Sequence, residues 1–349
     1  MLRCASGTGG DFMATVEEAE RLEPQARQAL AQYGLPAPSQ LELLTFSENA
    51  VFRAFFDSAE SVIVRLHSIG YHTKAAVESE LLWVEAIRRD TDVAVPPVIR
   101  TPAGDGVVVA TDPIFPARLA AVFGDLAGAA PSMDLMIADY RILGRTTAKL
   151  HRHACDWTPP AAFERISWDL AGTFGEKPTW GRWQDGPSLA AADISVLAAA
   201  EDLIRNRLTE YGRGPNRYGL IHSDLRLANI LMRDGVAQVI DFDDCGFGWY
   251  LYDLASALTF IEDDPQVPEL VASWLAGYTE VRPLDDADFA ITPSLIMLRR
   301  MVILAWLGSR PGTPVFIAEA PNYARVTGEM ARTYLASSGT DVCPGTATA

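Results

Sequence analysis

Hydrophobic residues form short β-type runs in the first third of the chain and mostly longer helical patterns in the rest. The β-type runs are residues 41–45, 50–56, 61–67, 107–110, 229–232 and 236–240. The first three are separated by short polar turns, which predicts an antiparallel meander. Apolar residues at helical spacing predict helices over residues 23–34, 73–89, 132–153, 189–211, 250–261, 286–307 and 318–335.

A hairpin with polar side chains at its ends stands out from this pattern. Its two apolar runs flank Asp234-Gly235, a pair that supplies the positive φ angles of a tight turn. The hairpin places Asn229 at the start of one strand and Asp241 at the end of the other. Asp224 lies on the loop that leads in, so three oxygen-bearing side chains are predicted to converge.

These side chains suit phosphate chemistry. Magnesium ions take oxygen ligands and need only one or two protein groups beside waters and substrate phosphates. Asn229 and Asp241 supply such a pair, and Asp224 stays available to accept a proton. The order His-x-Asp, four further residues, Asn, and then an acid after a strand is that of the catalytic and metal-binding loops of kinases.

A resemblance to a known family rests on His222-Ser223-Asp224 through Asp244, with Tyr252-Asp253-Leu254-Ala255 behind them. In these motifs the chain resembles the aminoglycoside phosphotransferase family, which includes choline kinases, homoserine kinases of the second type and a bacterial stress-response kinase. The resemblance implies an α+β, two-lobed protein kinase-like fold, with a small antiparallel N-lobe and a larger, mainly helical C-lobe. The implied parts are an N-terminal leader and helix (1–38), a nucleotide-binding N-lobe (39–124), a catalytic C-lobe (125–338) and a disordered tail (339–349).

The resemblance also implies where a nucleotide lies. The turn with Ser47 and Asn49 corresponds to the one above the nucleotide phosphates, and the alternative is an ordinary hairpin turn. Residues 121–128 are expected to carry the chain out of the sheet. In kinase-like folds this connector offers backbone groups to adenine, which assigns Phe123 and Asp125 to the cofactor site.

Arg65 and Glu80 resemble a second kinase feature, the strand lysine held by a helix glutamate. Arginine replaces lysine here, and a guanidinium can still grip phosphate oxygens. The alternative is a surface ion pair. Together with the downstream loop, the pair is expected to bind ATP.

Within the loop, the resemblance assigns a role to each polar group. Asp224 is the expected base, and Arg226 is expected to neutralise the transferring phosphoryl group, although relatives in the aminoglycoside branch mostly carry His there. His222 is expected to be a structural strut and Asp253 an anchor behind the loop. Asp243 is either a further metal ligand or a supporting group.

Two further segments have alternative interpretations. Residues 156–187 are rich in Trp, Pro and Gly, and either form a substrate wall with cation–π faces or simply pack an irregular segment. Glu262-Asp263-Asp264 either meets a cationic substrate or forms a solvated helix end. His151 and His153 are not expected to bind a metal, because positions i and i+2 do not share a helical face.

Composition limits the partners and the compartment. With 349 residues, 49% of them hydrophobic, and a formal net charge of -16, the chain is a globular protein and an unlikely nucleic-acid binder. The acidity mildly favours a cationic substrate; alternatively it only keeps the protein in solution. Four scattered cysteines favour a reducing cytoplasm. No signal peptide is expected, and Met13 is an alternative start.

The apolar run 294–307 is interrupted by Arg299 and Arg300, so no membrane span is expected.

The sequence thus predicts an ATP- and Mg2+-dependent phosphotransferase that acts on a hydroxyl of a small molecule, such as an amino alcohol, an amino acid or an aminoglycoside. Two features favour this over a regulated protein kinase: Ser223 replaces the arginine of that class, and Asp241-Phe242-Asp243 lacks its glycine. A stress-response Ser/Thr protein kinase and a nucleotide-binding pseudokinase scaffold are the alternatives. The acceptor, the choice between ATP and GTP and the oligomeric state stay open.

Overall fold

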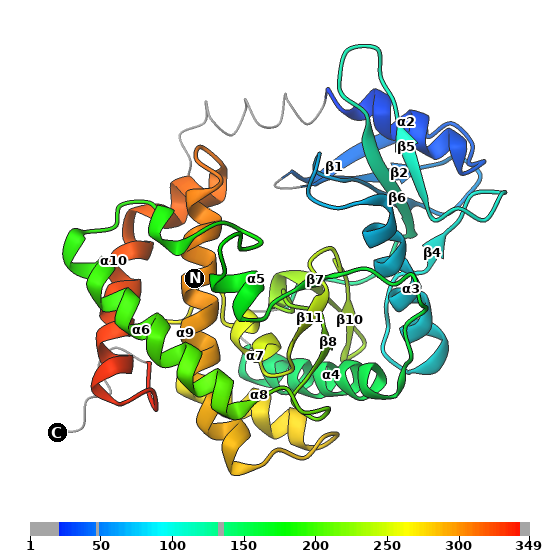
Figure 1. Ribbon diagram of the computed structural model, residues 1–349. Coiled ribbons are helices and arrows are strands. Elements are labelled where there is room, and N and C mark those ends of the chain that lie inside the picture. Colours follow the sequence, from blue (N-terminus) through cyan, green and yellow to red (C-terminus); the bar gives the residue numbers. More distant parts are fainter. Residues whose placement is uncertain (1–20, 47–48, 132–135, 343–349) are drawn as a thin grey trace.

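A computed structural model describes residues 21–46, 49–131 and 136–342. Figure 1 shows an N-lobe with a twisted sheet beside a larger, mainly helical C-lobe. The N-lobe strands are β1 (Gln40–Phe46), β2 (Ala50–Phe55), β3 (Val62–Leu66), β4 (Val98–Ile99), β5 (Val107–Ala110) and β6 (Arg118–Gly124). They are antiparallel in the order β1-β2-β3-β6-β4, and β5 also pairs with β6. The predicted meander and the α+β class are confirmed.

Strand β6 corrects one expectation. The sequence assigned residues 121–128 to a connector that leaves the sheet, but residues 121–124 belong to β6, which pairs with β3, β4 and β5. Both faces of β6 are covered: Ala120 and Val122 pack with helix α2 (Glu23–Gln32), and Ala121 and Phe123 pack with helix α3 (Lys74–Asp90). A strand buried on both faces lacks the polar alternation that marks a half-exposed one.

Helix α3 joins the two lobes. It begins at Thr73, whose side-chain oxygen accepts a hydrogen bond from the backbone N–H of Ala76. Further along, Trp83 is fully buried and packs edge-on against Phe242 of the C-lobe, with ring centroids 5.5 Å apart. Helix α3, which carries Glu80, therefore packs into the hydrophobic cores of both the N-lobe and the C-lobe.

The C-lobe is built from helices of very different length around a single apolar core. They are α4 (Met136–Asp156), α5 (Leu170–Phe174), α6 (Ala191–Tyr211), α7 (Tyr252–Ala257), α8 (Val267–Thr279), α9 (Asp286–Gly308) and α10 (Pro314–Ala336). Helices α4 and α8 approach closely because Gly144 and Gly277 lie at their contact. A Cβ on Gly144 would lie 2.0 Å from the backbone oxygen of Trp274.

The helices differ from the predicted ones in several places. Helices α5 and α8 were not predicted, α7 is shorter than the expected 250–261, and α10 begins at Pro314 and not at 318. The N-cap residues of α7 and α8, Leu251 and Gln266, make no side-chain capping hydrogen bond, although α8 has a proline and Glu269 in its first turn.

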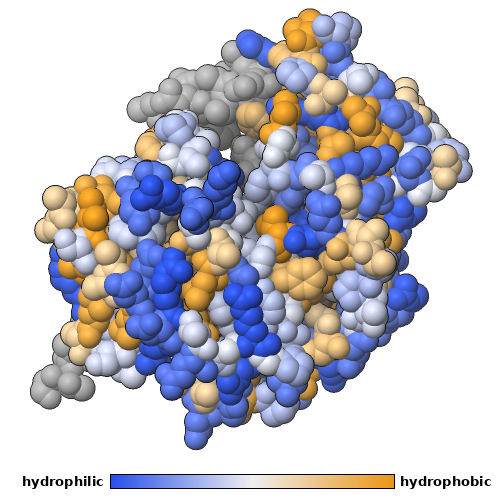
Figure 2. Space-filling view, viewed as in Figure 1, coloured by the Kyte–Doolittle hydropathy of each residue, from blue (hydrophilic) through white to orange (hydrophobic). Residues whose placement is uncertain are grey.

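Helix α9 is long and apolar enough to cross a membrane by length and composition. However, 83% of its most apolar window is buried inside the protein, where it packs against α6, α7 and α10. Its hydropathy is accounted for by its place in the C-lobe core. Figure 2 shows polar residues over much of the visible face, with hydrophobic residues in small groups.

Small sheets complete the C-lobe. The predicted hairpin is confirmed as β9 (Ile230–Arg233) and β10 (Val236–Val239), and Asp234 and Gly235 have φ angles of 52° and 75°. Strands β7 (Ile166–Ser167), β11 (Gly246–Trp249) and β8 (Tyr218–Ile221) pair in that order. A bridge between Ala129 and Met232 ties the chain after β6 to the hairpin. Because the N-lobe sheet ends at Gly124, we propose lobes of residues 39–124 and 125–338.

Candidate active site

The loop between β8 and β9 is held from behind by Asp253 of α7. Its carboxylate accepts hydrogen bonds from the backbone N–H groups of Ser223 (2.6 Å) and His222 (3.1 Å), and from His151 Nε2 (2.9 Å). Asp253 is fully buried, and Ser223 has a φ of 66°, a conformation that the carboxylate stabilises. The predicted anchoring role fits these contacts, and His151 is part of the anchor rather than a metal ligand.

His222 joins the loop to the end of the hairpin. Its Nε2 lies 3.1 Å from the backbone oxygen of Ile240, the residue before Asp241. Burial lowers the pKa of His222, so the ring is neutral and Nε2 donates to the carbonyl. This contact fixes the spacing between the segments that carry Asp224 and Asp241, as expected of a strut.

Asp224 and Asn229 are in direct contact. Asn229 Nδ2 lies 2.8 Å from both the backbone oxygen and the Oδ2 atom of Asp224. Both partners are acceptors, so the amide nitrogen must face Asp224 and the amide Oδ1 faces elsewhere. The backbone of Asn229 also accepts a hydrogen bond from Ile240, which brings it beside the end of β10.

Asp241 follows at the end of the hairpin, with a φ of 62°. Desolvation by the surrounding protein raises the pKa of the Asp241 carboxyl to about 7; Asp243, Asp224 and Glu80 add repulsion, and Arg65 acts in the opposite direction. Carboxylates that oppose one another's ionisation favour a bound cation. The amide Oδ1 of Asn229 and the carboxylate of Asp241 are hard oxygen donors, and thus fit the predicted Mg2+ pair.

Arg65 and Glu80 form a buried ion pair. Arg65 Nη2 lies 2.6 Å from both carboxylate oxygens of Glu80, and the two side chains are 5% and 1% exposed. Arg65 Nη1 lies 3.4 Å from Asp241 Oδ1, and the carboxylates raise the pKa of Arg65. The alternative of a surface pair is therefore wrong. The guanidinium lies 5.1 Å from the ring centroid of Phe123, which supports it from β6.

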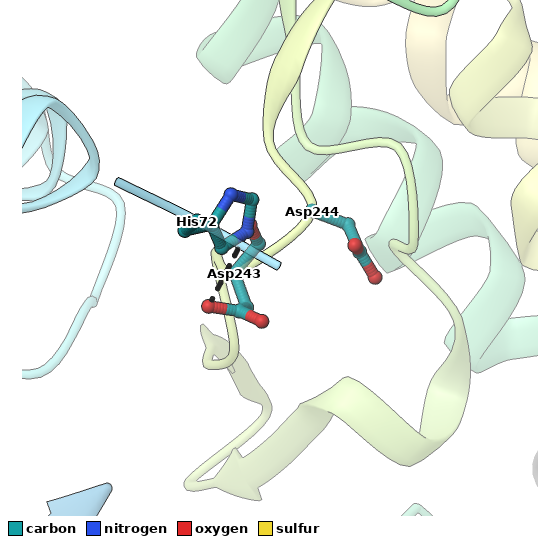
Figure 3. A group of neighbouring side chains, drawn as sticks. All are labelled: His72, Asp243 and Asp244. Carbon is teal, nitrogen blue, oxygen red and sulfur yellow. Dashed lines mark hydrogen bonds and ion pairs between the residues drawn. The ribbon is translucent and has the colours of Figure 1, made fainter. Parts of the chain in front are cut away.

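A polar cluster of Asn49, His67, His72 and Asp243 bridges the lobes. Asn49 Nδ2 donates to Asp243 Oδ2 at 2.8 Å, and His67 Nδ1 lies 3.2 Å from Asp243 Oδ1. His72 Nε2 lies 2.8 Å from the Asp243 backbone oxygen (Figure 3). The Asn49 side chain is thus engaged with the C-lobe. Ser47, its predicted companion, lies outside the described residues.

His72, Asp243 and Asp244 are close enough to suggest a metal site, but their bonding argues against one. Burial lowers the pKa of His72 to about 4, so the ring is neutral, and its Nε2 carries the proton that it donates to the Asp243 carbonyl. Asp243 Oδ1 already has two protein neighbours, His67 Nδ1 at 3.2 Å and Arg65 Nη2 at 3.8 Å. Asp243 is therefore a link between the lobes.

Asp125 directly follows β6, an inner strand of the N-lobe sheet. Its carboxylate accepts hydrogen bonds from Arg53 Nε and Ser61 Oγ, both at 2.8 Å. These hydrogen bonds fix the position of the residue that directly follows β6. Contact between the backbone of residues 123–125 and adenine stays a prediction.

Arg226 is partly exposed beside Asp224. Its Nε lies 3.3 Å from Asp224 Oδ2, and its guanidinium lies 5.9 Å from the ring centroid of Phe260. Since the side chain is 35% exposed, it has room to reach a phosphate. Its phosphate-neutralising role stays a prediction.

The sequence missed Arg299, which reaches the site from α9. Its Nη2 lies 2.7 Å from Asp224 Oδ1, although the two residues are 75 positions apart. The sequence treated Arg299 and Arg300 only as interruptions of an apolar run. Two arginines inside an otherwise apolar helix indicate buried ion pairs or hydrogen bonds, because a buried cation requires a partner.

The Trp-rich segment mainly packs the core. Trp168 and Trp183 are buried, which favours the packing alternative for them. Trp180 lies under Arg299, whose guanidinium is 5.2 Å from its ring, and donates from Nε1 to the hydroxyl of Tyr71. Only Trp180 of these three thus borders the site, and its cation partner is the protein's own arginine.

The acidic run after α7 divides into two environments. Glu262 is fully buried and pairs with Arg300 at 2.6 Å, so it is neither solvated nor available to a substrate. Asp263 and Asp264 are exposed, as expected of a solvated helix end.

Comparison with known proteins places the chain among phosphotransferases. The model of the phosphotransferase enzyme family matches residues 42–284, which include Arg65, Glu80, Asp224, Asn229 and Asp241. The solved structure of a microcompartment-associated aminopropanol kinase is 43% identical, with a TM-score of 0.83 over 91% of this chain and 98% of that one.

Two further relatives match over most of their length. A protein of Deinococcus radiodurans is 31% identical over 301 residues, 83% of each chain. Amicoumacin kinase of Bacillus subtilis is 25% identical over 295 residues, 80% of this chain and 83% of its own. These matches confirm the resemblance and the kinase-like fold expected from the sequence.

Proposed function

Because the chain belongs to the phosphotransferase enzyme family, we propose that it transfers the γ-phosphate of ATP to the hydroxyl group of a small amino alcohol. The general activity, ATP-dependent phosphorylation of a small-molecule hydroxyl, is that of the family. The observation that carries the choice of acceptor is the 43% identity, across 91% of this chain, to an aminopropanol kinase. The formal charge of -16 also favours a cationic acceptor over an anionic one.

The site supplies a base for the acceptor. Asp224 takes the hydroxyl proton as the acceptor oxygen forms a bond to the γ-phosphorus and the bond from that phosphorus to the ADP oxygen breaks. Three donors already contact the Asp224 carboxylate, from Arg299, Asn229 and Arg226. A carboxylate has about four lone-pair positions, so about one is left for the hydroxyl.

Two arginines would contact the phosphates. Arg65, oriented by Glu80, faces Asp241 across the space between the lobes and would grip non-bridging phosphate oxygens. Arg226 would neutralise charge on the transferring group. Asn229 and Asp241 would hold Mg2+, which when bound neutralises charge on the ATP phosphates.

The proposal is tested by supplying ATP and Mg2+ with panels of amino alcohols, aminoglycosides, amino acids and a generic protein. We expect turnover with amino alcohols such as 1-amino-2-propanol. Asp224→Ala should remove turnover, by about 100-fold or more, and leave ATP binding intact. Phosphate that appears only on serine of the protein substrate would instead support the stress-response protein kinase.

We also propose a cytoplasmic location. Cys155 and Cys245 are free thiols in the described part of the chain, as expected in a reducing compartment. Extracellular protein in a fractionation of the native host would contradict this.

A further inference from the structure

Helix α9 carries two neighbouring arginines in the C-lobe core. The side chains of Arg299 and Arg300 are 1% and 2% exposed, and each buried guanidinium must be compensated by partners. Arg300 pairs with Glu262 and donates to Thr327 Oγ1 at 3.0 Å, which ties α9 to α10. Arg299 instead points to Asp224, so the two have different tasks.

Arg299 is held by several elements at once. Its Nε donates to Thr259 Oγ1 at 3.0 Å, and its Nη1 lies 3.3 Å from the hydroxyl of Tyr252. Its guanidinium carbon lies 5.2 Å from the Trp180 ring centroid and 5.6 Å from that of Tyr252. These contacts leave Nη2 aimed at Asp224 Oδ1, 2.7 Å away.

The contacts to Asp224 are divided unequally between its oxygens. Oδ2 accepts from Asn229 (2.8 Å) and Arg226 (3.3 Å), whereas Oδ1 accepts from Arg299. Because each carboxylate oxygen has about two lone-pair directions, the position still open lies on Oδ1. The acceptor hydroxyl would therefore approach the oxygen that Arg299 holds.

We propose that Arg299 is a positioning residue, which fixes Oδ1 of Asp224 as the proton-accepting oxygen and orients it toward the acceptor hydroxyl. This inference rests on the proposed function in taking Asp224 as the base. Arg299 does not need to touch ATP or the acceptor, since it acts through the carboxylate. A planar, permanently charged guanidinium, which here contacts Thr259, Tyr252 and Asp224 through three different nitrogens, suits this task better than a lysine, which makes a less directional contact.

The test compares Arg299→Met, Arg299→Lys, Asp224→Asn and the double variant Asp224→Asn/Arg299→Met. We expect Arg299→Met to lower kcat by about 100-fold, a loss that misplacing a reacting group by about 1 Å can cause, with the KM for ATP changed less than about twofold. Arg299→Lys should recover part of the loss. In the Asp224→Asn background, Arg299→Met should lower the residual rate by less than about twofold, because the residue acts through Asp224.

Milder variants keep the test valid if Arg299→Met fails to fold. Thr259→Val and Tyr252→Phe each remove one hydroxyl that Arg299 contacts and leave the cation in place. Both should lower kcat several-fold and leave the KM for ATP unchanged, with the melting temperature of the C-lobe within a few degrees of wild type. Unchanged kcat in both would overturn the proposal.

Other outcomes also separate the explanations. Losses that multiply in the double variant would overturn the proposal and indicate a role independent of Asp224. A higher KM for the acceptor at unchanged kcat in Arg299→Met would also overturn it, in favour of a binding residue. The rates are measured with whichever acceptor the wild-type enzyme phosphorylates, so rejection of amino alcohols would refute the proposed acceptor and leave the test of Arg299 intact.

Discussion

The substitution Asp253→Asn tests how the catalytic loop is held, because it keeps the shape of the side chain while it replaces one oxygen with an NH2 group and removes the negative charge. In the structure, Oδ1 accepts from the Ser223 N–H, and Oδ2 accepts from the His222 N–H and from His151 Nε2. His151 can change tautomer, since its other nitrogen faces the hydroxyl of Tyr278. A backbone N–H has no such choice.

Either orientation of the new amide therefore leaves one buried backbone N–H facing another donor. An unsatisfied buried donor costs about 1–3 kcal/mol, which is a large part of a typical stability of about 5–15 kcal/mol but not all of it. The variant should fold, with its loop displaced. A shift of about 1 Å in Asp224 is enough to lower kcat by about 100-fold.

The assay combines urea unfolding, followed by tryptophan fluorescence, with kcat at saturating ATP and acceptor. We expect Asp253→Asn to lower the free energy of unfolding by about 1–3 kcal/mol and kcat by about 100-fold. Asp263→Asn is the matched control, because Asp263 is exposed, and should change neither quantity. Wild-type stability and kcat in Asp253→Asn would refute the anchoring argument.

Three more predictions follow from the geometry. Glu80→Gln leaves the Arg65 guanidinium buried without its main carboxylate. It should lower the free energy of unfolding by about 3 kcal/mol and raise the KM for ATP. A wild-type melting temperature and KM would contradict this. Gly144→Ala should lower the melting temperature, because its Cβ would lie 2.0 Å from the Trp274 backbone oxygen. Overpacking costs about 1–3 kcal/mol, which exceeds the free energy that alanine gains over glycine from its higher helix propensity. Chelation with EDTA should stop turnover and added Mg2+ or Mn2+ should restore it, whereas turnover that persists in EDTA would refute the assignment of a metal to Asn229 and Asp241.

Local signals predicted much of the fold and the core of the site. The Asp234-Gly235 turn set the hairpin register, and this register brought Asn229 beside the residue that precedes Asp241. Alternating and helical patterns located β1 to β3 and most of the long helices. Strand β6 was missed because it is buried on both faces, and helix α8 was missed although a proline and Glu269 lie in its first turn.

The sequence by itself determined the chemistry: an acid, an amide and a second acid at kinase-like spacing, with an arginine and a glutamate upstream. These groups lie on elements whose local structure follows from turn residues and periodicity. The tertiary structure decided which groups are buried and paired. It placed Arg299 on Asp224 across 75 positions and Asn49 on Asp243 across 194. Contacts over such separations depend on how helices and lobes pack, and the spacing of residues along the chain does not specify that packing.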